Sequence, residues 1–209
     1  MRGLEMPELL PGLDVSRETI SALEEYAALL AKWSSKINLV SKSDRKQLWD
    51  RHIMDSAQII QNIGDTFENW VDLGSGGGLP GLVVSILSRE LCPARKMILI
   101  ESDQRKAVFL RTAIRHLNLS ATVDSRRIEE HQNNEYGVVS ARALAPLEKL
   151  ISYSDPLVAK DGYCLFMKGR SWEKEVSNAQ KEWKFHLEAI KSKTSEQAVI
   201  LKIGDISRA

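Results

Sequence analysis

The sequence predicts an α/β fold with a mostly parallel, seven-stranded sheet that carries helices on both faces and follows a helical N-terminal region. Residues 1–67 contain two helical apolar stripes and no convincing strand. From Trp70 onward, short apolar runs alternate with amphipathic segments, which is typical of strands joined by helical crossovers. The first run enters a glycine-rich turn, as the first strand of many nucleotide-binding sheets does. We therefore expect a helical region over 1–67 that packs on a core domain over 68–209.

The N-terminal region is expected to form two helices, each with one apolar face. The first helix is capped by Asp14 or Ser16, and the second begins at Ser43 or Asp44 after a loop rich in serine. In both helices the apolar residues recur three or four positions apart, which places them on one face. They are Ile20, Leu23, Ala27 and Leu30 in the first helix, and Trp49, Ile53, Ala57 and Ile60 in the second.

Five apolar runs are candidate parallel strands, and helices are expected after the first, second and fourth of them. The runs are Trp70–Leu73, Met97–Ile100, Ala121–Val123, Val138–Ala141 and Tyr163–Met167. A further helical segment is expected around Glu173–Lys181. The last two runs, Phe185–Ala189 and Ala198–Ile203, are separated by a polar stretch that is too short for a helical crossover. We therefore expect these two to pair antiparallel at the edge of the sheet.

Composition and charge exclude several classes of protein. The chain has 29 Lys+Arg against 28 Asp+Glu, so its formal net charge is +1, and 27% of its residues are charged. This balance is ordinary for a soluble globular protein, and it lacks the basic excess of a protein that binds bare nucleic acid through phosphates alone. No apolar stretch is long enough for a membrane span, and the N-terminus lacks the apolar stretch of a signal peptide. We expect a cytoplasmic protein with no membrane partner.

Cysteine and histidine residues show neither a metal site nor a nucleophile. Cys92 and Cys164 lie far apart without C-x-x-C spacing, so we expect two small thiols in a reducing compartment. The histidines have no metal-ligand spacing, and no metal is expected. His52 and Asp55 lie one turn apart beside the second apolar stripe. We expect them to form a hydrogen-bonded pair that holds the helical region to the sheet, without a role in catalysis.

The most informative segment is the glycine-rich turn after the first strand, Asp72-Leu73-Gly74-Ser75-Gly76-Gly77-Gly78-Leu79-Pro80-Gly81. Its glycines allow positive φ and let a ligand approach the backbone at the carboxyl end of the strand. Residues 76–81 satisfy the dinucleotide pattern G-x-G-x-x-G, which leaves an NAD-dependent oxidoreductase open. Asp72 would repel a pyrophosphate and suits the ammonium group of S-adenosylmethionine. Glu101, after the second strand, can accept hydrogen bonds from the ribose hydroxyls of either ligand.

The glycine turn resembles the cofactor loop of the bacterial small-subunit rRNA methyltransferase G family, also called glucose-inhibited division protein B. Other segments fall in the order expected for that family, and together they cover roughly residues 20–203. These segments are Asn38-Leu39-Val40, Arg51-His52-Ile53-Met54-Asp55-Ser56, Glu101-Ser102, Arg105-Lys106, Phe109-Leu110, Ser140-Ala141-Arg142-Ala143 and Lys168-Gly169. Each segment alone is weak evidence, whereas the ordered combination is specific.

The resemblance implies a Rossmann-like class I methyltransferase fold, with residues 68–209 as the S-adenosylmethionine-binding domain. It also implies methylation of N7 of one guanine in a decoding-region loop of 16S rRNA, which leaves S-adenosylhomocysteine. The partner is then 16S rRNA, the small ribosomal subunit or its precursor, and we expect the enzyme to be a monomer. Gly74, Leu79, Ile128, Glu129 and Arg142 contact the cofactor by resemblance, and the turn and second strand add Asp72, Gly76, Gly78 and Glu101.

The implied chemistry needs positioning rather than a catalytic residue, because guanine N7 carries a lone pair and no proton. Arg142, after the fourth strand, is a candidate clamp for the cofactor carboxylate or an RNA phosphate, with a surface ion pair to Glu148 as the alternative. Lys168 ends the fifth strand on the same edge and is a second candidate for phosphate. The remaining candidate RNA contacts are Arg105, Lys106 and Arg111, on one helix whose basic face is equally consistent with simple solvation.

Two other functions stay open. One is the NAD-dependent oxidoreductase, which requires NADH to bind more tightly than S-adenosylhomocysteine. The other is a noncatalytic ribosome assembly factor on a nucleotide-binding fold, which would bind ribosomes without incorporating methyl groups and would tolerate the change Asp72→Ala.

Overall fold

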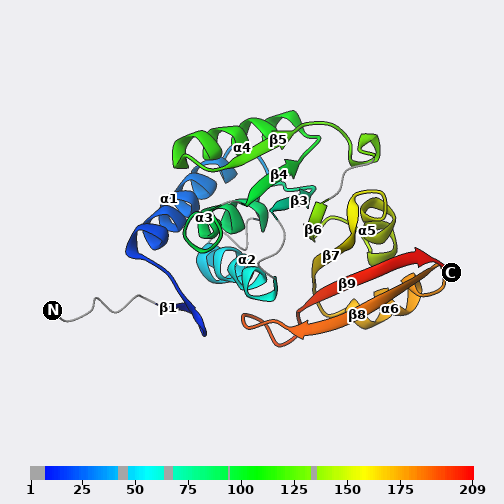
Figure 1. Ribbon diagram of the computed structural model, residues 1–209. Helices are drawn as coiled ribbons and strands as arrows, with labels where there is room; N and C mark the ends of the chain where they lie inside the picture. Colours follow the sequence, from blue (N-terminus) through cyan, green and yellow to red (C-terminus); the bar gives the residue numbers. More distant parts are fainter. Residues whose placement is uncertain (1–7, 42–46, 64–67, 94, 133–135) are drawn as a thin grey trace.

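The computed structural model describes residues 8–41, 47–63, 68–93, 95–132 and 136–209 (Figure 1). Its centre is a seven-stranded sheet with the order β5-β4-β3-β6-β7-β9-β8. The strands are β3 (Asn69–Leu73), β4 (Lys96–Ile100), β5 (Ala121–Asp124), β6 (Tyr136–Arg142), β7 (Val158–Lys168), β8 (Trp183–Lys191) and β9 (Val199–Arg208). Neighbouring strands from β5 to β7 are parallel, and β9 is antiparallel to both β7 and β8. The predicted fold class and the antiparallel pair at the edge are confirmed.

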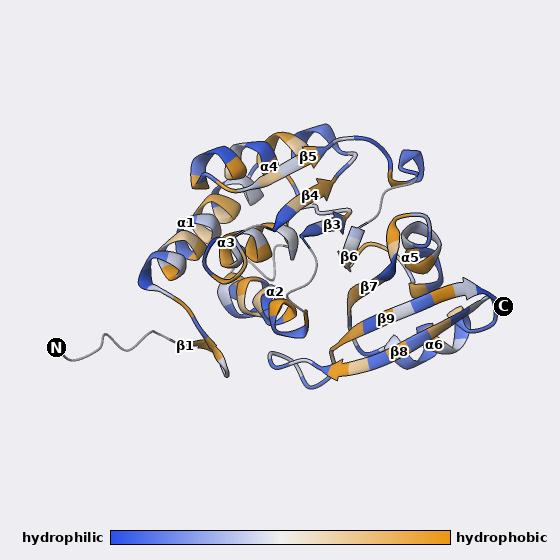
Figure 2. Ribbon diagram, in the orientation of Figure 1, coloured by the Kyte–Doolittle hydropathy of each residue, from blue (hydrophilic) through white to orange (hydrophobic). Residues whose placement is uncertain are grey.

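Helices cover both faces of the sheet, and each face has its own hydrophobic core. The helices of eight residues or more are α1 (Arg17–Ser34), α3 (Gly81–Leu91), α4 (Gln104–Leu117), α5 (Leu147–Ser154) and α6 (Trp172–Ala179). One core joins α1, α3 and α4 to residues such as Trp70 and Leu99, and the other joins α5 and α6 to residues such as Val71 and Ile100. Successive strand residues therefore serve opposite faces, as pleating requires. In Figure 2, β4 and much of β7 have the colour of hydrophobic residues, whereas β8 and β9 at the edge of the sheet mix hydrophobic and hydrophilic residues.

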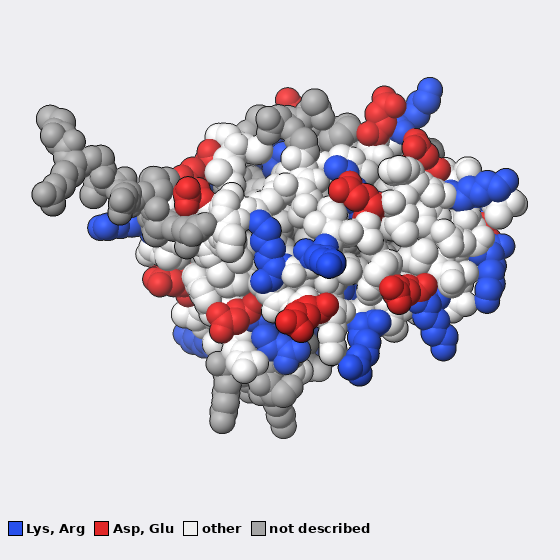
Figure 3. All heavy atoms as spheres, turned by 90° about the horizontal axis from the view of Figure 1, so that it is seen from below, with Lys and Arg blue, Asp and Glu red and all other residues white. Residues whose placement is uncertain are grey.

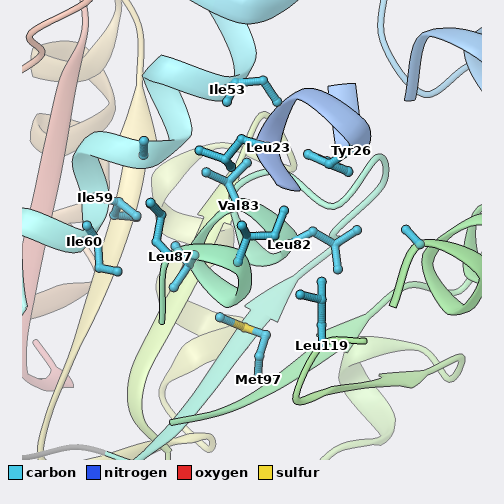
Figure 4. Packing of buried hydrophobic residues seen from close by; sticks show 14 of the residues in the cluster. Leu23, Tyr26, Ile53, Ile59, Ile60, Leu82, Val83, Leu87, Met97 and Leu119 are labelled. Atoms are coloured by element: carbon cyan, nitrogen blue, oxygen red, sulfur yellow. The ribbon is translucent and has the colours of Figure 1, made fainter. Parts of the chain in front are cut away.

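The N-terminal helix α1 packs on the sheet through α3, and the two share one core. Ser16 caps α1 by accepting a hydrogen bond from the Thr19 amide at 3.2 Å, so Ser16 is the cap among the two candidates. Leu23 and Tyr26 of α1 point toward Leu82 and Val83 of α3 in Figure 4. All four of these side chains are fully buried. Burial of a large apolar side chain contributes about 2 kcal/mol, so this contact fixes α1 firmly beside the start of α3.

The prediction that residues 1–67 contain no strand is wrong. Strands β1 (Glu8–Leu10) and β2 (Leu13–Asp14) form a small antiparallel hairpin that turns at Gly12, where φ is +76°. Leu9, Leu10 and Leu13 are buried in the same core as α1. Strands of three and two residues are too short to show an alternating pattern, and so the periodicity of the sequence does not reveal them.

The second predicted helix is less regular than its apolar stripe suggests. Its expected start at Ser43 or Asp44 lies outside the described residues. The chain then forms the π-helix η2 (Trp49–Met54), the single α-turn α2 (Asp55–Ala57) and the 3₁₀ helix η3 (Gln58–Asn62). The predicted face is nevertheless buried at Ile53, Ala57 and Ile60. A π-turn widens the backbone and leaves carbonyls for other donors, and the Arg51 carbonyl indeed accepts from Arg142 at 3.0 Å.

In the described part of the chain, no helix has both the length and the apolar character that crossing a membrane requires. The crossovers after the first, second and fourth parallel strands are α3, α4 and α5, as predicted. Between β5 and β6, the 3₁₀ helix η4 (Ile128–Glu130) is the only helical element among the described residues.

Candidate active site

The glycine turn connects β3 to α3 at the carboxyl edge of the sheet, and its backbone requires glycine. Gly74, Gly76 and Gly78 have φ of +60°, +56° and +85°, a region that residues with a Cβ rarely adopt. A Cβ at Gly74 would also collide with the side chain of Leu144 from the β6–α5 connection. Tyr26 of α1 donates its hydroxyl to the Gly77 carbonyl, so the N-terminal helix helps to hold the turn. The predicted alternation of glycines thus has a structural cause.

Glu101, directly after β4, is joined to the glycine turn. One oxygen of its carboxylate accepts from the Gly76 amide at 2.9 Å, and the other accepts from the Asp103 amide at 2.8 Å. The side chain is largely buried, at 7% exposed. Two backbone donors therefore fix the carboxylate beside the turn, where it keeps lone pairs for further donors such as the hydroxyls of a ribose.

A cavity of about 340 Å³, hereafter the cofactor cavity, opens beside the glycine turn. Among the predicted cofactor residues, Gly74, Glu101, Ile128 and Glu129 line it. Four other lining residues are not among the predicted cofactor residues: Arg126, Arg127, Leu144 and Tyr153. Tyr153 donates its hydroxyl to the Glu129 carboxylate at 2.9 Å. A hydrogen bond from the Glu129 backbone and, second to it, the bond from Tyr153 lower the pKa of Glu129. The structure therefore brings four expected residues from three separate segments to one cavity.

Asp72 lies behind the glycine turn rather than in the cofactor cavity. The carboxylate is fully buried; it accepts from the Ser140 hydroxyl at 2.7 Å and from the Gly81 amide at 3.2 Å. Ser140 in turn accepts from the Trp70 indole N–H at 2.8 Å. Burial raises the pKa of Asp72 from 3.8 to about 6. A polar Ser140 within the apolar strand β6 was the sequence signal for this network, because a buried hydroxyl needs a partner.

The other predicted loop residues support the turn from within. The Gly78 amide donates to the Ser75 carbonyl at 2.7 Å, which closes the turn. Leu79 is half-buried and packs against the core of the α1 face, and it does not line the cofactor cavity. A contact between Leu79 and the cofactor therefore stays a prediction.

Arg142 joins the N-terminal region to the end of β6 through an ion pair with Asp55, whereas the alternative considered from the sequence was an ion pair with Glu148. Its Nε lies 3.5 Å from the Asp55 carboxylate, and its Nη2 lies 2.6 Å from Nδ1 of His52. Its Nη1 donates to the Ser56 hydroxyl at 3.3 Å. His52 and Asp55 thus hold the helical region to the sheet through Arg142.

The candidate RNA contacts do not form one surface. Lys168 donates to the Ala145 carbonyl and to the Glu175 carboxylate, both at 2.7 Å, and its side chain is only 9% exposed. Lys106 lines the cofactor cavity. Arg105 pairs with Asp103, and Arg111 donates to the Ser125 hydroxyl, both on the exposed side of α4. Lys168 is therefore engaged inside the protein, while Arg105 and Arg111 of α4 are exposed.

Two further cavities continue from the cofactor cavity along the same edge of the sheet. A middle cavity of about 510 Å³ shares Ala143 and Leu144 with the cofactor cavity. An outer cavity of about 600 Å³ shares Asp55 and Arg142 with the middle one. Residues 143–144 therefore lie between the cofactor cavity and the middle cavity, which places two potential ligand sites next to each other.

The sheet order, with a glycine turn after β3 and an acidic residue after β4, defines the fold of the class I S-adenosylmethionine-dependent methyltransferases. A TehB-like S-adenosylmethionine-dependent methyltransferase from Corynebacterium glutamicum superposes with a TM-score of 0.56 at 12% identity, over 88% of this chain and 98% of that one.

The model of the family described as "rRNA small subunit methyltransferase G" matches residues 19–201 of this chain. Relatives of that name from Ruegeria sp. (strain TM1040) and Cereibacter sphaeroides are 46% and 48% identical to this chain. They align over 94% and 91% of it, and over 95% and 92% of their own lengths. The chain therefore belongs to the rRNA small subunit methyltransferase G family.

Proposed function

We propose that this protein uses S-adenosylmethionine to methylate N7 of a guanine in 16S rRNA, in a decoding-region loop of the small ribosomal subunit. The observation that carries the proposal is the cofactor cavity, where the glycine turn and the paired Glu101 carboxylate meet the middle cavity at Leu144. Membership in an rRNA methyltransferase family supports the nature of the substrate. The choice of guanine N7 rests on the family resemblance.

The residues of the cofactor cavity fit S-adenosylmethionine. Glu101 holds its carboxylate where ribose hydroxyls can donate to it, and the turn at Gly74 and Gly76 has no side chains to obstruct a ligand. Glu129 and the buried Asp72 add negative charge around a ligand that carries a sulfonium and an ammonium group. When bound, S-adenosylmethionine supplies a methyl group activated by the positive sulfur.

The chain's own contribution to the reaction is positioning. Guanine N7 needs no base, so the protein has to hold two ligands in line and keep water away. Ala143 and Leu144 lie at the junction of the cofactor and middle cavities, and Leu144 packs on Gly74. Arg142 is locked by Asp55 and His52, which fixes the start of this junction on β6. These contacts give a preformed edge against which the base and the methyl donor can align.

The test is methyl transfer to small-subunit RNA from a strain that lacks this methylation, with radiolabelled S-adenosylmethionine and the purified protein. The proposal predicts incorporation at one guanine and tighter binding of S-adenosylhomocysteine than of NADH in equilibrium titrations. Tighter binding of NADH would support the oxidoreductase alternative instead. Ribosome binding without incorporation would support a noncatalytic assembly factor.

A further inference from the structure

The three cavities lie in a row, and their linings differ in character. The middle cavity has apolar walls from the β6–α5 connection and the strands β7 and β9, supplied by Leu144, Pro146, Met167, Val199 and Ile200. The outer cavity has no such wall and is lined by charged and hydroxyl groups, including Arg51, Arg142 and Arg170. A flat heteroaromatic ring suits the first lining, and an anion suits the second.

The outer cavity is lined by three arginines and two aspartates. Arg51 belongs to η2 and Arg170 follows β7, and both side chains are exposed. Arg142 forms an ion pair with Asp55, and Asp50 is the other acid of the lining. Guanidinium groups bind phosphate oxygens in a bidentate way that matches their planar geometry. This cavity therefore has the chemistry of a phosphate site, and the ion pair between Arg142 and Asp55 forms part of its lining.

The wall between the middle and outer cavities is held in place by hydrogen bonds. The turn between β8 and β9 contributes Thr194, whose hydroxyl donates to Asp55 at 2.8 Å, and Lys193, whose amide donates to the Gln58 side chain at 2.8 Å. Asp55 is bound to Arg142 on the other side. The β8–β9 turn, the N-terminal region and β6 are thus connected through one carboxylate, so the shape of both cavities is set before any ligand arrives.

We propose that the middle and outer cavities together bind a single RNA nucleotide turned out of its strand, with the base in the middle cavity and a flanking phosphate at Arg51 and Arg170. This inference rests on the proposed function and extends it to the site that holds the substrate. The order of the cavities matches the order of groups in the reaction: methyl donor, base, phosphate. A base that enters the middle cavity reaches Ala143 and Leu144 with its reactive edge while its phosphate stays in the outer cavity.

The proposal explains how a protein of net charge +1 can bind RNA selectively. On the face shown in Figure 3, Lys and Arg side chains are interspersed with Asp and Glu side chains and separated by uncharged surface. Such a surface gives little general attraction to phosphates. Two arginines beside an apolar cavity favour binding of a nucleotide whose base can leave its stack, as a base in an RNA loop can.

The experiment compares the double variant Arg51→Ala/Arg170→Ala with the wild type in methyl transfer and RNA binding at several salt concentrations. If each arginine neutralises one phosphate of single-stranded RNA, the slope of log Kd against log salt falls by about 1.4. The KM for RNA is expected to rise at least about tenfold near physiological salt. The kcat and the Kd for S-adenosylhomocysteine stay within about twofold, because neither arginine lines the cofactor cavity.

The matched control removes two exposed positive charges elsewhere, Arg17 at the start of α1 and Lys184 on β8, by Arg17→Ala/Lys184→Ala. It should leave KM and the salt slope unchanged. The variant Arg51→Lys/Arg170→Lys keeps both charges and should retain most of the slope while still raising KM, since lysine lacks the bidentate geometry.

Three results would overturn the proposal. The first is an unchanged RNA affinity in Arg51→Ala/Arg170→Ala; the second is an equal loss in the control; the third is loss of the salt slope only in Arg105→Ala/Arg111→Ala on α4. A failure of the proposed function is recognised separately, because the wild type itself would then transfer no methyl group to the RNA.

Discussion

The change Asp72→Asn should make the protein more stable at neutral pH and weaken its binding of the cofactor. The Asp72 carboxylate is fully buried, and its hydrogen-bond donors, Ser140 and Gly81, are neutral groups. Burial raises its pKa from 3.8 to about 6. That difference corresponds to a cost of about 3 kcal/mol for keeping the group ionised in the folded protein. Asparagine has nearly the same shape: its oxygen can accept from Gly81, and its amino group can donate to Ser140, whose hydroxyl then accepts instead of donating. The loss of this donated bond makes the cost of the buried charge an upper limit for the gain in stability.

The sign of the pH dependence follows from the raised pKa. The folded protein binds this proton more tightly than the unfolded chain does, so the stability contributed by this site falls as the pH rises from about 4 to about 6. Above pH 6 the whole cost is present, and below pH 4 it vanishes. The asparagine variant should therefore exceed the wild type by up to about 3 kcal/mol at pH 7.5 and by about half as much at pH 5.

Urea denaturation at pH 5, 6 and 7.5 measures this difference, and titration with S-adenosylhomocysteine measures the functional loss. Asp103→Asn is the control, because hydrogen bonds and the nearby Arg105 lower the pKa of Asp103, so its replacement should give no gain in stability at neutral pH. A variant Asp72→Asn that is less stable than the wild type at every pH, or whose difference does not change with pH, would refute the reasoning. Unchanged affinity for S-adenosylhomocysteine would show that the buried charge does not serve the cofactor.

Three further predictions concern single positions. Gly74→Ala should lower the free energy of unfolding by about 1–3 kcal/mol and weaken cofactor binding, because φ at this position is +60° and the new Cβ collides with Leu144. In thermal unfolding, the double variant Gly74→Ala/Leu144→Ala should regain only the part of this stability that the collision removes. Glu101→Gln should raise the Kd for S-adenosylhomocysteine about tenfold in calorimetric titration, because a neutral amide accepts hydrogen bonds from hydroxyls less strongly than a carboxylate does. An unchanged Kd would show that Glu101 does not bind the cofactor. Cys164 should react with a thiol reagent at pH 8 only after unfolding, because burial raises its pKa to about 12; rapid labelling of the native protein would contradict the burial.

The parts of this protein that the sequence predicts well are those set by local chemistry. The turn at Gly74, Gly76 and Gly78 needs glycine because its backbone has positive φ, and that requirement is visible in the chain itself. The antiparallel β8–β9 pair is predictable because a short polar connection allows no crossover.

The parts that escape prediction depend on which distant groups the fold brings together. Asp72 looked like a ligand-facing carboxylate, but only the pleat of β3 against β6 turns it toward Ser140. Arg142 forms an ion pair with Asp55, which lies 87 positions earlier in the chain. It also donates to the carbonyl of Arg51, in the neighbouring π-helix η2. Neither contact has a local pattern in the sequence, since side-chain direction at a strand end is decided by its neighbours in space.

Mass mapping of methylated nucleotides in 16S rRNA from cells with and without this protein tests methylation of guanine N7 directly. We expect one 7-methylguanosine, in a loop of the decoding region, that is present with the wild-type protein and absent without it. Identical methylation in both strains, or a difference at another base or another atom of guanine, would contradict it.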